Sequence, residues 1–402
     1  MDLYIARQPI FDRGKGVVGY ELLFRDSLVN YFPRVDRDTA TTKVLSGSFF
    51  SFGMERITGE KKAFINFTQN LLTSEIPYMF PAESTVIEIL EEVRAVPSVI
   101  EACRKLSLAG YALALDDYFP KNNMQALVKL ANIIKIDIQA MTVEEINKIM
   151  LDPASRKIKF LSEKIETYEE LKKAMDMGFD YFQGFFFSKP EIIKGRDISA
   201  SAMHLLNLVI AVSKPDADMN ELAEIVEREV SLSYKLLRYA NSASLRRGVK
   251  ISSVKNALML IGLNELKRLV SLILLSKTAV NKPDELIKSS CVKARFCEGL
   301  AQASTSSAIK QELFLLGLFA RLDAILDQPM RAIMEQIPIS KNISAALVNG
   351  EGEALPYLRL SDCYEKGDWD NVKKYASQVS INEDELPNIY ADACQWANEF
   401  VI

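Results

Sequence analysis

The stretch YALALDDYF, residues 111–119, runs from small and apolar side chains directly into two adjacent carboxylates. A short apolar run bounded by polar residues is typical of a strand buried on both faces. Asp116 and Asp117 carry like charges, which repel each other unless a cation lies between them or the side chains point apart. Which of these holds depends on the residues that the rest of the chain brings to this strand end.

Similar apolar runs recur through the first half of the chain, separated by segments with helical spacing such as YEELKKAM (168–175). Strand and helix in regular alternation predict a parallel α/β fold. About 198 residues is close to the lower limit for a (β/α)8, TIM-like barrel, so we expect some of its helices to be short or missing. The other runs are 17–24, 62–67, 85–90, 132–138, 157–163 and 179–187.

Six polar residues stand late in these runs or just after them, at intervals of 19 to 28 residues. They are Asn66, Glu88, Asp116, Lys135, Glu163 and Gln183. In a parallel barrel the carboxyl ends of all strands meet at one rim, where enzymes of this fold keep their reacting groups. A single acid at a strand end is more often a helix cap or part of a surface ion pair. One such residue per strand is much harder to obtain by accident.

The expected rim is rich in hard oxygen ligands, because Glu21 and Asp117 would join the acids already named. Mg²⁺ or Mn²⁺ would relieve the repulsion among them, since both ions favour carboxylate and amide oxygens. Two such ions are a common arrangement for the attack of water on a phosphodiester. Lys135 would then stabilise developing negative charge or orient the water.

After about residue 198 the pattern becomes helical throughout, as in MNELAEIVEREV and YKLLRYANSA. We therefore expect a barrel domain over residues 1–198 and an all-helical domain over residues 199–402, an α/β fold followed by an all-α fold.

Composition limits the possible partners and the location. The formal net charge of −4 argues against direct binding to DNA, which normally requires a basic face. The five cysteines are scattered and odd in number, which favours reduced thiols and a cytoplasmic location. The N-terminus lacks the pattern of a signal peptide, and the chain has no apolar run long enough to span a membrane, so no membrane association is expected.

The ordered motifs of the first half resemble the EAL-domain phosphodiesterases of cyclic di-GMP. Glu21-Leu22-Leu23-Phe24-Arg25 is similar to the signature Glu-Ala-Leu-Leu-Arg of that family. The other motifs that carry the resemblance are Arg7-Gln8-Pro9-Ile10, Ile65-Asn66-Phe67-Thr68, Glu88-Ile89-Leu90-Glu91, Asp116-Asp117, Lys135-Ile136-Asp137, Glu163-Lys164-Ile165-Glu166 and Gln183-Gly184-Phe185.

The resemblance implies a role for each of these positions. It implies that one metal ion binds Glu21, Asn66, Glu88 and Asp116. Asp116 would bridge to a second ion bound by Asp117 and Glu163, and Glu163 is the alternative general base. Lys135 and Gln183 would position the attacking water, and Arg25 would hold a substrate phosphate. Gln8 and Glu166 are implied as nucleotide contacts, and Glu91 as support for the loop after the aspartate pair.

The loop after Asp117 departs from the family. The family continues Asp-Asp-Phe-Gly-Thr-Gly, whereas this chain has Tyr118-Phe119-Pro120-Lys121-Asn122-Asn123. Loss of both glycines and the gain of a proline require a different backbone path. Three functions therefore stay open: hydrolysis of cyclic di-GMP to pGpG, a receptor that binds it with little turnover, and a scaffold for other proteins. A homodimer is possible in each case.

The segment 201–280 resembles the HDOD domain, a helical relative of the HD phosphohydrolases, on residues 236–243, 251–257 and 260–263. HD hydrolases hold their metals with several histidines and aspartates, but this chain has a single histidine, His204. Leu322-Asp323 stands where a His-Asp pair would be expected. We therefore expect the helical half to regulate the barrel or to bind an unknown protein partner.

Overall fold

The computed structural model describes residues 4–25, 54–119, 124–152, 157–189, 200–214, 217–227, 230–241, 251, 253–278, 282–304 and 312–399. The chain divides into two compact units. The first comprises Met1–Lys189, Leu360–Gln378 and Asn382–Glu399, and the second Pro190–Arg359, Val379–Ile381 and Phe400–Ile402. Most of the last forty residues therefore belong with the barrel, whereas the sequence pattern grouped them with the helical half.

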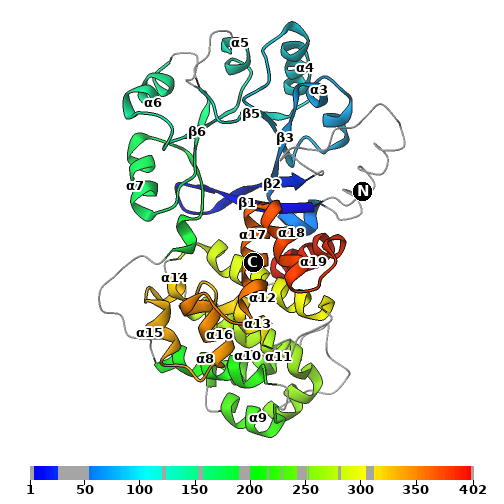
Figure 1. Ribbon diagram of the computed structural model, residues 1–402, viewed down its shortest axis with the longest axis vertical. Helices are drawn as coiled ribbons and strands as arrows, with labels where there is room; N and C mark the ends of the chain where they lie inside the picture. Colours follow the sequence, from blue (N-terminus) through cyan, green and yellow to red (C-terminus); the bar gives the residue numbers. More distant parts are fainter. Residues whose placement is uncertain are drawn as a thin grey trace. The chain divides into compact units, whose positions relative to one another are not determined.

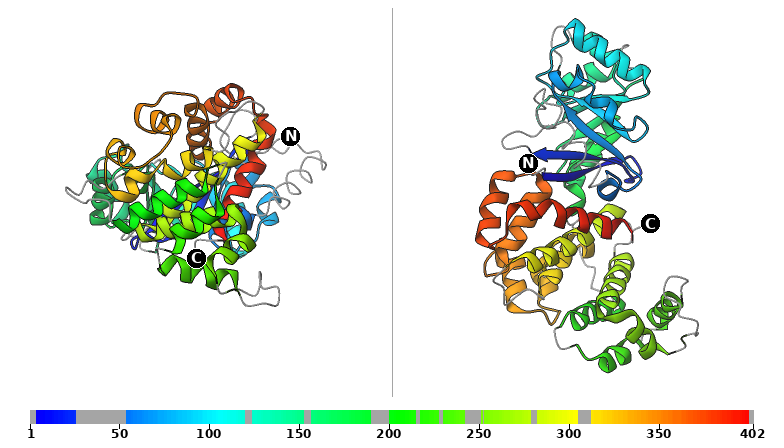
Figure 2. Two further views of the ribbon diagram at one scale, coloured as in Figure 1. Left: turned by 90° about the horizontal axis from the view of Figure 1, so that it is seen from below. Right: turned by 90° about the vertical axis from the view of Figure 1, so that its right-hand side faces the viewer.

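Eight strands form a closed barrel in which neighbours follow chain order, as the sequence predicted. They are β1 (Tyr4–Asp12), β2 (Val17–Arg25), β3 (Lys62–Phe67), β4 (Thr85–Ile89), β5 (Ala112–Leu115), β6 (Ile133–Asp137), β7 (Lys159–Glu163) and β8 (Tyr181–Gln183). All neighbours from β2 to β8 are parallel. β1 was not expected as a strand, and it runs antiparallel to both β2 and β8. The long β1–β2 pair is drawn in dark blue in Figure 2.

Short helices lie outside the strands, as expected for so small a barrel (Figure 1). They are α2 (Met54–Thr58), α3 (Gln69–Leu72), α4 (Pro97–Leu108), α5 (Gln125–Val128), α6 (Val143–Met150) and α7 (Tyr168–Met177), with 3-10 turns at Ile76–Met79 and Phe186–Ser188. Capping boxes fix where two of them begin. Thr142 and Glu145 satisfy each other's backbone N–H groups at α6, and Thr167 and Glu170 do so at α7.

The barrel interior contains an apolar layer to which six strands each contribute one buried residue. These residues are Ile10, Phe64, Val86, Ala114, Ile133 and Leu161. Gly19 on β2 leaves room for this layer, because a Cβ atom there would lie 2.6 Å from the ring of Phe64. The layer matters for the site, since side chains two positions further along a strand point to the same side.

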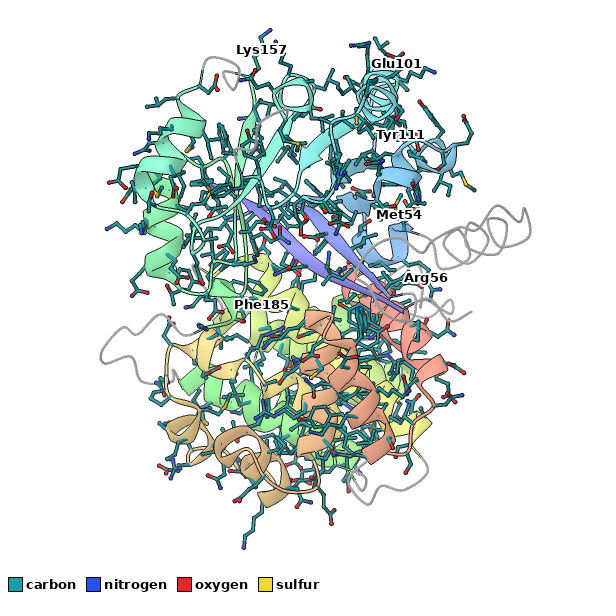
Figure 3. The ribbon with its side chains drawn as sticks, turned by 45° about the horizontal axis from the view of Figure 1, so that its top comes forward. Met54, Arg56, Glu101, Tyr111, Lys157 and Phe185 are labelled. Atoms are coloured by element: carbon teal, nitrogen blue, oxygen red, sulfur yellow. The ribbon has the colours of Figure 1, made fainter. Side chains whose placement is uncertain are left out.

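Three C-terminal helices contribute to the barrel's unit: α17 (Leu355–Lys366) from Leu360 onward, α18 (Trp369–Gln378) and α19 (Leu386–Asn398). Helix α19 contacts α2 and β1 (Figure 1). Arg56 of α2, labelled in Figure 3, donates hydrogen bonds to Asp392 at 2.5 Å and Gln395 at 2.6 Å. The side chain of Asn398 donates to the backbone carbonyl of Arg56 at 2.8 Å.

The second unit is helical in every element that the structure describes. Its helices are α8 (Ala200–Val212), α9 (Met219–Glu227), α10 (Val230–Ala240), α11 (Val254–Thr278), α12 (Asp284–Ala303), α13 (Leu313–Phe319), α14 (Leu322–Leu326), α15 (Met330–Met334) and α16 (Lys341–Ser344), followed by a π-helical turn at Ala345–Asn349 and the start of α17. Gly262, with φ of 81°, kinks α11. Across the described segments we find no helix with the length and apolar character needed to cross a membrane.

Candidate functional site

A polar layer lies directly above the apolar layer of the barrel. Asn66, Glu88, Asp116, Lys135 and Glu163 each come two residues after an apolar-layer residue of the same strand or strand end. Gln8 comes two residues before Ile10, because β1 runs in the opposite direction. Each of these strands thus turns an apolar and then a polar side chain toward the inside. The sequence pattern of one polar residue at each strand end follows from these two layers.

Lys135 lies at the centre of the polar layer and is fully buried. Its Nζ atom is 2.7 Å from Asp116, 2.9 Å from Glu88, 3.0 Å from Glu163 and 3.1 Å from Glu21. Burial alone would lower the pKa of Lys135, but the four carboxylates outweigh it and hold this pKa well above its usual value. The ammonium group is therefore charged, and four acids from four different strands or strand ends converge on it.

Glu21 is the best-satisfied acid of the four. Its carboxylate accepts hydrogen bonds from Asn66 at 3.0 Å and from Gln183 at 2.6 Å, in addition to the one from Lys135. Burial acts to raise its pKa, but the Lys135 ammonium and these donors reverse the effect and leave the pKa below its usual value. The side chain of Gln183 also donates to Gln8 at 3.0 Å. Gln183 therefore connects the β1 residue Gln8 to the cluster of acids.

Glu88 and Glu163 are in the opposite situation. Burial raises the pKa of Glu88 well above its usual value, and the charge of Glu21 adds to the effect. Burial likewise raises the pKa of Glu163 to about 8, despite the opposing influence of Lys135. Burial also raises the pKa of Asp116. One ammonium group does not neutralise four buried carboxylates, so part of the cluster holds protons unless further cations bind.

The donor set of the polar layer fits hard divalent cations. Carboxylate and amide oxygens are the ligands that Mg²⁺ and Mn²⁺ prefer. Three buried oxygens, Oε2 of Glu88, Oε2 of Glu163 and Oδ1 of Asn66, accept no hydrogen bond from the described residues. Among those same residues, however, no three acidic, histidine or cysteine side chains are already arranged as a metal-holding group.

Asp116 and Asp117 point apart, which answers how the chain tolerates them side by side. The backbone N–H of Asp116 donates to Ile89 at 3.0 Å, and its side chain pairs with Lys135. Asp117 has a φ of 39°, and its side chain lies 3.6 Å from Lys164 instead. Lys164 also pairs with Asp137 at 2.7 Å. Each aspartate therefore pairs with a different lysine, and this difference could not be predicted from the sequence.

Much of the polar layer lines the floor of a pocket of about 390 Å³, but Glu88 and Lys135 are not part of its lining. Its lining residues are Gln8, Glu21, Leu23, Asn66, Leu90, Glu91, Glu92, Asp116, Asp117, Glu163, Lys164, Gln183 and Lys366. Glu91, expected to support the neighbouring loop, therefore faces this pocket. Lys366 was not among the residues expected at the site, because it lies more than 180 residues after Gln183 along the chain.

Two expected substrate contacts lie elsewhere or cannot be placed. Glu166 is exposed, pairs with Lys189 at 2.9 Å and does not line the pocket. Arg25 ends β2, but its side chain lies outside what the structure describes. Residues 120–123 of the altered loop also fall outside the described segments.

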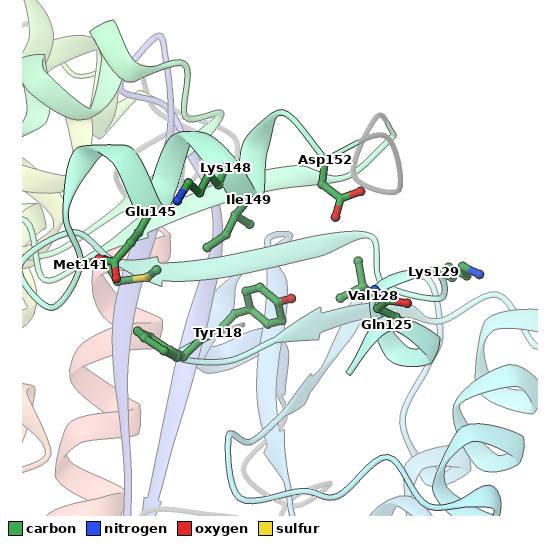
Figure 4. A pocket seen from close by; sticks show the side chains of 10 residues that line it. Tyr118, Gln125, Val128, Lys129, Met141, Glu145, Lys148, Ile149 and Asp152 are labelled. Carbon is green, nitrogen blue, oxygen red and sulfur yellow. The ribbon is translucent and has the colours of Figure 1, made fainter. Parts of the chain in front are cut away.

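A second pocket of about 550 Å³ lies beside α5 and α6 (Figure 4). Tyr118, Val128 and Ile149 contribute apolar surface to it, and Lys148 and Asp152 contribute opposite charges. It is the larger of the two, but it contains none of the clustered acids, so we assign the chemistry to the smaller pocket.

Comparison with known proteins identifies two domains in the chain. The EAL domain model matches residues 50–190 and the HDOD domain model matches residues 200–337. Strands β1 and β2 precede the matched EAL residues, so the place of Glu21 in the site rests on the geometry above.

Two relatives match the chain almost from end to end. The uncharacterized protein YuxH of Bacillus subtilis is 35% identical, over 100% of this chain and 99% of the relative. The cyclic di-GMP phosphodiesterase CdgJ of Vibrio cholerae is 36% identical, over 98% of this chain and 92% of the relative.

Solved structures with EAL domains are also similar. The Bacillus subtilis YkuI protein, in complex with cyclic di-GMP and calcium, is 20% identical, covers 66% of this chain and 72% of its own, and has a TM-score of 0.38. A cyclic di-GMP-bound standalone EAL protein of Vibrio cholerae is 23% identical, covers 47% of this chain and 92% of its own, and has a TM-score of 0.36. With two full-length relatives above 30% identity, the chain belongs to the family of proteins in which an EAL domain precedes an HDOD domain.

Proposed function

We propose that the barrel hydrolyses cyclic di-GMP to the linear dinucleotide pGpG with the help of two divalent cations, Mg²⁺ or Mn²⁺. The observation that carries the proposal is the convergence of four carboxylates on Lys135, three of which, those of Glu21, Asp116 and Glu163, also line the 390 Å³ pocket. The full-length likeness to a named cyclic di-GMP phosphodiesterase supports the choice of substrate.

In this proposal the acids divide into two overlapping groups. Glu21, Asn66, Glu88 and Asp116 would hold one ion, and Asp116, Asp117 and Glu163 the other. The ions would neutralise the scissile phosphodiester and acidify the attacking water. Arg25 would hold a phosphate, Glu91 would support the loop, and Gln8 would contact the nucleotide.

The chain's own groups would position the reactants. With cations held by the acids, the Lys135 ammonium would be free to donate to the phosphate as negative charge develops on it. Gln183 donates a 2.6 Å hydrogen bond to Glu21, which keeps its amide at the floor, where it can orient the water. Glu163 lines the pocket beside Asp116, where it would serve as the general base if it does not bind the second ion.

The test is incubation of the purified protein with cyclic di-GMP and Mn²⁺ or Mg²⁺, with pGpG measured by chromatography. We expect turnover that Glu21→Ala and Glu163→Gln abolish. Glu169→Ala, which removes an exposed acid of α7, is the matched control and should retain full activity. Absence of pGpG from the wild type, with the protein folded and both metals tried, would contradict hydrolysis.

A receptor for cyclic di-GMP is the second candidate, because Asp117 is engaged by Lys164 rather than by the central cluster. Binding measured by calorimetry, with no pGpG formed, would favour a receptor over an enzyme.

We further propose that the helical unit regulates the barrel or binds a protein partner, and that the chain can form a homodimer. A cytoplasmic location belongs to the same proposal and is supported by five free cysteine thiols.

A further inference from the structure

The pocket above the polar layer has a wall built from the far end of the chain. Lys366, the last residue of α17, lines this pocket together with Leu23 of β2. Both residues belong to the compact unit of the barrel. An EAL barrel that ended near residue 190, where the domain model stops matching, would lack this residue.

The end of α17 is held firmly against β2. Gly367 has a φ of 67°, and a Cβ atom on it would lie 3.1 Å from Cδ1 of Leu23. The following Trp369 packs edge-on against the fully buried Tyr364, with ring centroids 5.3 Å apart. The backbone at residue 366 is therefore anchored on both sides, although the Lys366 side chain itself is exposed.

Lys366 differs from the other lysine of this pocket in its lack of an ion pair with any described residue. The lining includes six acidic residues but only two lysines, Lys164 and Lys366. Lys164 is engaged by Asp137 at 2.7 Å and Asp117 at 3.6 Å. Within the described segments Lys366 forms no ion pair, and its Nζ atom lies 5.8 Å from the ring centroid of Phe185. It also lies near enough to Glu166 to contribute to the lowered pKa of that acid, after the larger influence of Lys189.

A cyclic dinucleotide carries two phosphodiester groups, and only one of them can lie at the floor. The other must then lie nearer the mouth, where the exposed Glu91 and Glu92 would repel it. We propose that Lys366 binds this second, uncleaved phosphate, and so makes the C-terminal helices part of the substrate site. The inference rests on the proposed function and adds a binding residue to it. A hydrogen bond to a charged group contributes about 1.5–3 kcal/mol, which corresponds to a change in affinity of about 10-fold or more.

The experiment compares wild type with Lys366→Gln and Lys366→Arg, and uses Lys373→Gln, an exposed lysine of α18, as the matched control. For cyclic di-GMP we expect Lys366→Gln to raise KM, or Kd measured by calorimetry, about 10-fold with little change in kcat. Lys366→Arg should restore most of the affinity, and Lys373→Gln should change nothing. The affinity of Lys366→Gln should also depend less on salt concentration.

A second substrate separates this role from a structural one. Bis(p-nitrophenyl) phosphate has a single phosphodiester group, so its KM should be the same in wild type and Lys366→Gln. An unchanged affinity of Lys366→Gln for cyclic di-GMP would overturn the inference alone, as would an equal loss for both substrates. If the wild type neither binds nor hydrolyses cyclic di-GMP, the proposed function fails and the inference fails with it.

Discussion

Replacing Lys135 by methionine tests whether this lysine holds the acidic cluster together. Its side chain is 1% exposed, so the variant leaves four carboxylates buried around an uncharged thioether. Removing one partner from a buried ion pair costs about 3–5 kcal/mol. We expect the metal-free variant to lose about that much unfolding free energy at pH 8, measured by urea denaturation in the presence of a chelator. Tryptophan fluorescence suits this measurement, because Trp369 and Trp396, the two tryptophans of the chain, both belong to the barrel's unit.

The loss should shrink as the pH falls. Without the ammonium, the folded-state pKa values of Glu88, Asp116 and Glu163 rise further above their unfolded values, and the pKa of Glu21 loses the main influence that lowers it. The folded variant then binds more protons than the unfolded chain, and its stability increases as the pH falls from 8 towards 5. Mn²⁺ should also restore stability at pH 8. Lys159→Met is the control, since Lys159 pairs with Asp180 at 2.8 Å on the exposed surface and its loss should shift the unfolding midpoint little. A deficit below about 1 kcal/mol at pH 8, or one independent of pH, would refute the central role of Lys135.

Three further predictions concern the same barrel. Burial raises the pKa of Glu163 to about 8, so the metal-free wild type should lose stability as the pH rises from about 4.5 to 8; Glu163→Gln should show a smaller slope, since Glu88 and Asp116 contribute the rest, and be the more stable protein at pH 9 in urea denaturation. Mn²⁺ binding at pH 7 should release protons, because Glu88 and Glu163 must ionise to bind it; calorimetry in two buffers of different protonation heat measures the number, and zero would contradict the proposed ligands. Gly184→Ala should prevent folding, since φ is 150° and the new Cβ would lie 1.9 Å from the Ile165 carbonyl oxygen, whereas Gly178→Ala, with its nearest neighbour at 3.8 Å, should cost only about 1 kcal/mol and stay soluble.

The barrel could be predicted because its strands are short apolar runs that end in a polar residue. Phe64-Ile65-Asn66 and Val86-Ile87-Glu88 each place an apolar and then a polar side chain on the same face, two residues apart. β1 was missed because YIARQPIFD mixes polar and apolar residues and contains a proline. That pattern is typical of an edge strand or a turn, and only closure of the barrel buries it between β2 and β8.

The site could be predicted only in part, because sequence position shows which strand end a residue occupies but not where its side chain points. The sequence placed Lys135 at the rim, yet nothing in it shows that one ammonium group contacts four acids. The pairing of Asp117 with Lys164 likewise depends on left-handed backbone at both residues, with φ of 39° and 57°. The place of Lys366 in the pocket could not be predicted, because helical periodicity alone does not show which unit a C-terminal helix joins.

The contribution of the C-terminal helices follows from the small size of the barrel. A barrel of this kind needs an outer layer over each strand, but α2 and α3 have only five and four residues. Helix α19 packs on α2 and β1, and the buried Tyr390 of α19 packs at a tilt against Tyr364 of α17, with ring centroids 4.8 Å apart. Among the described residues, helices near the other end of the chain therefore supply cover beside α2 and β1. Lys366 ends α17 within the same unit, so this cover also contributes a residue to the pocket lining.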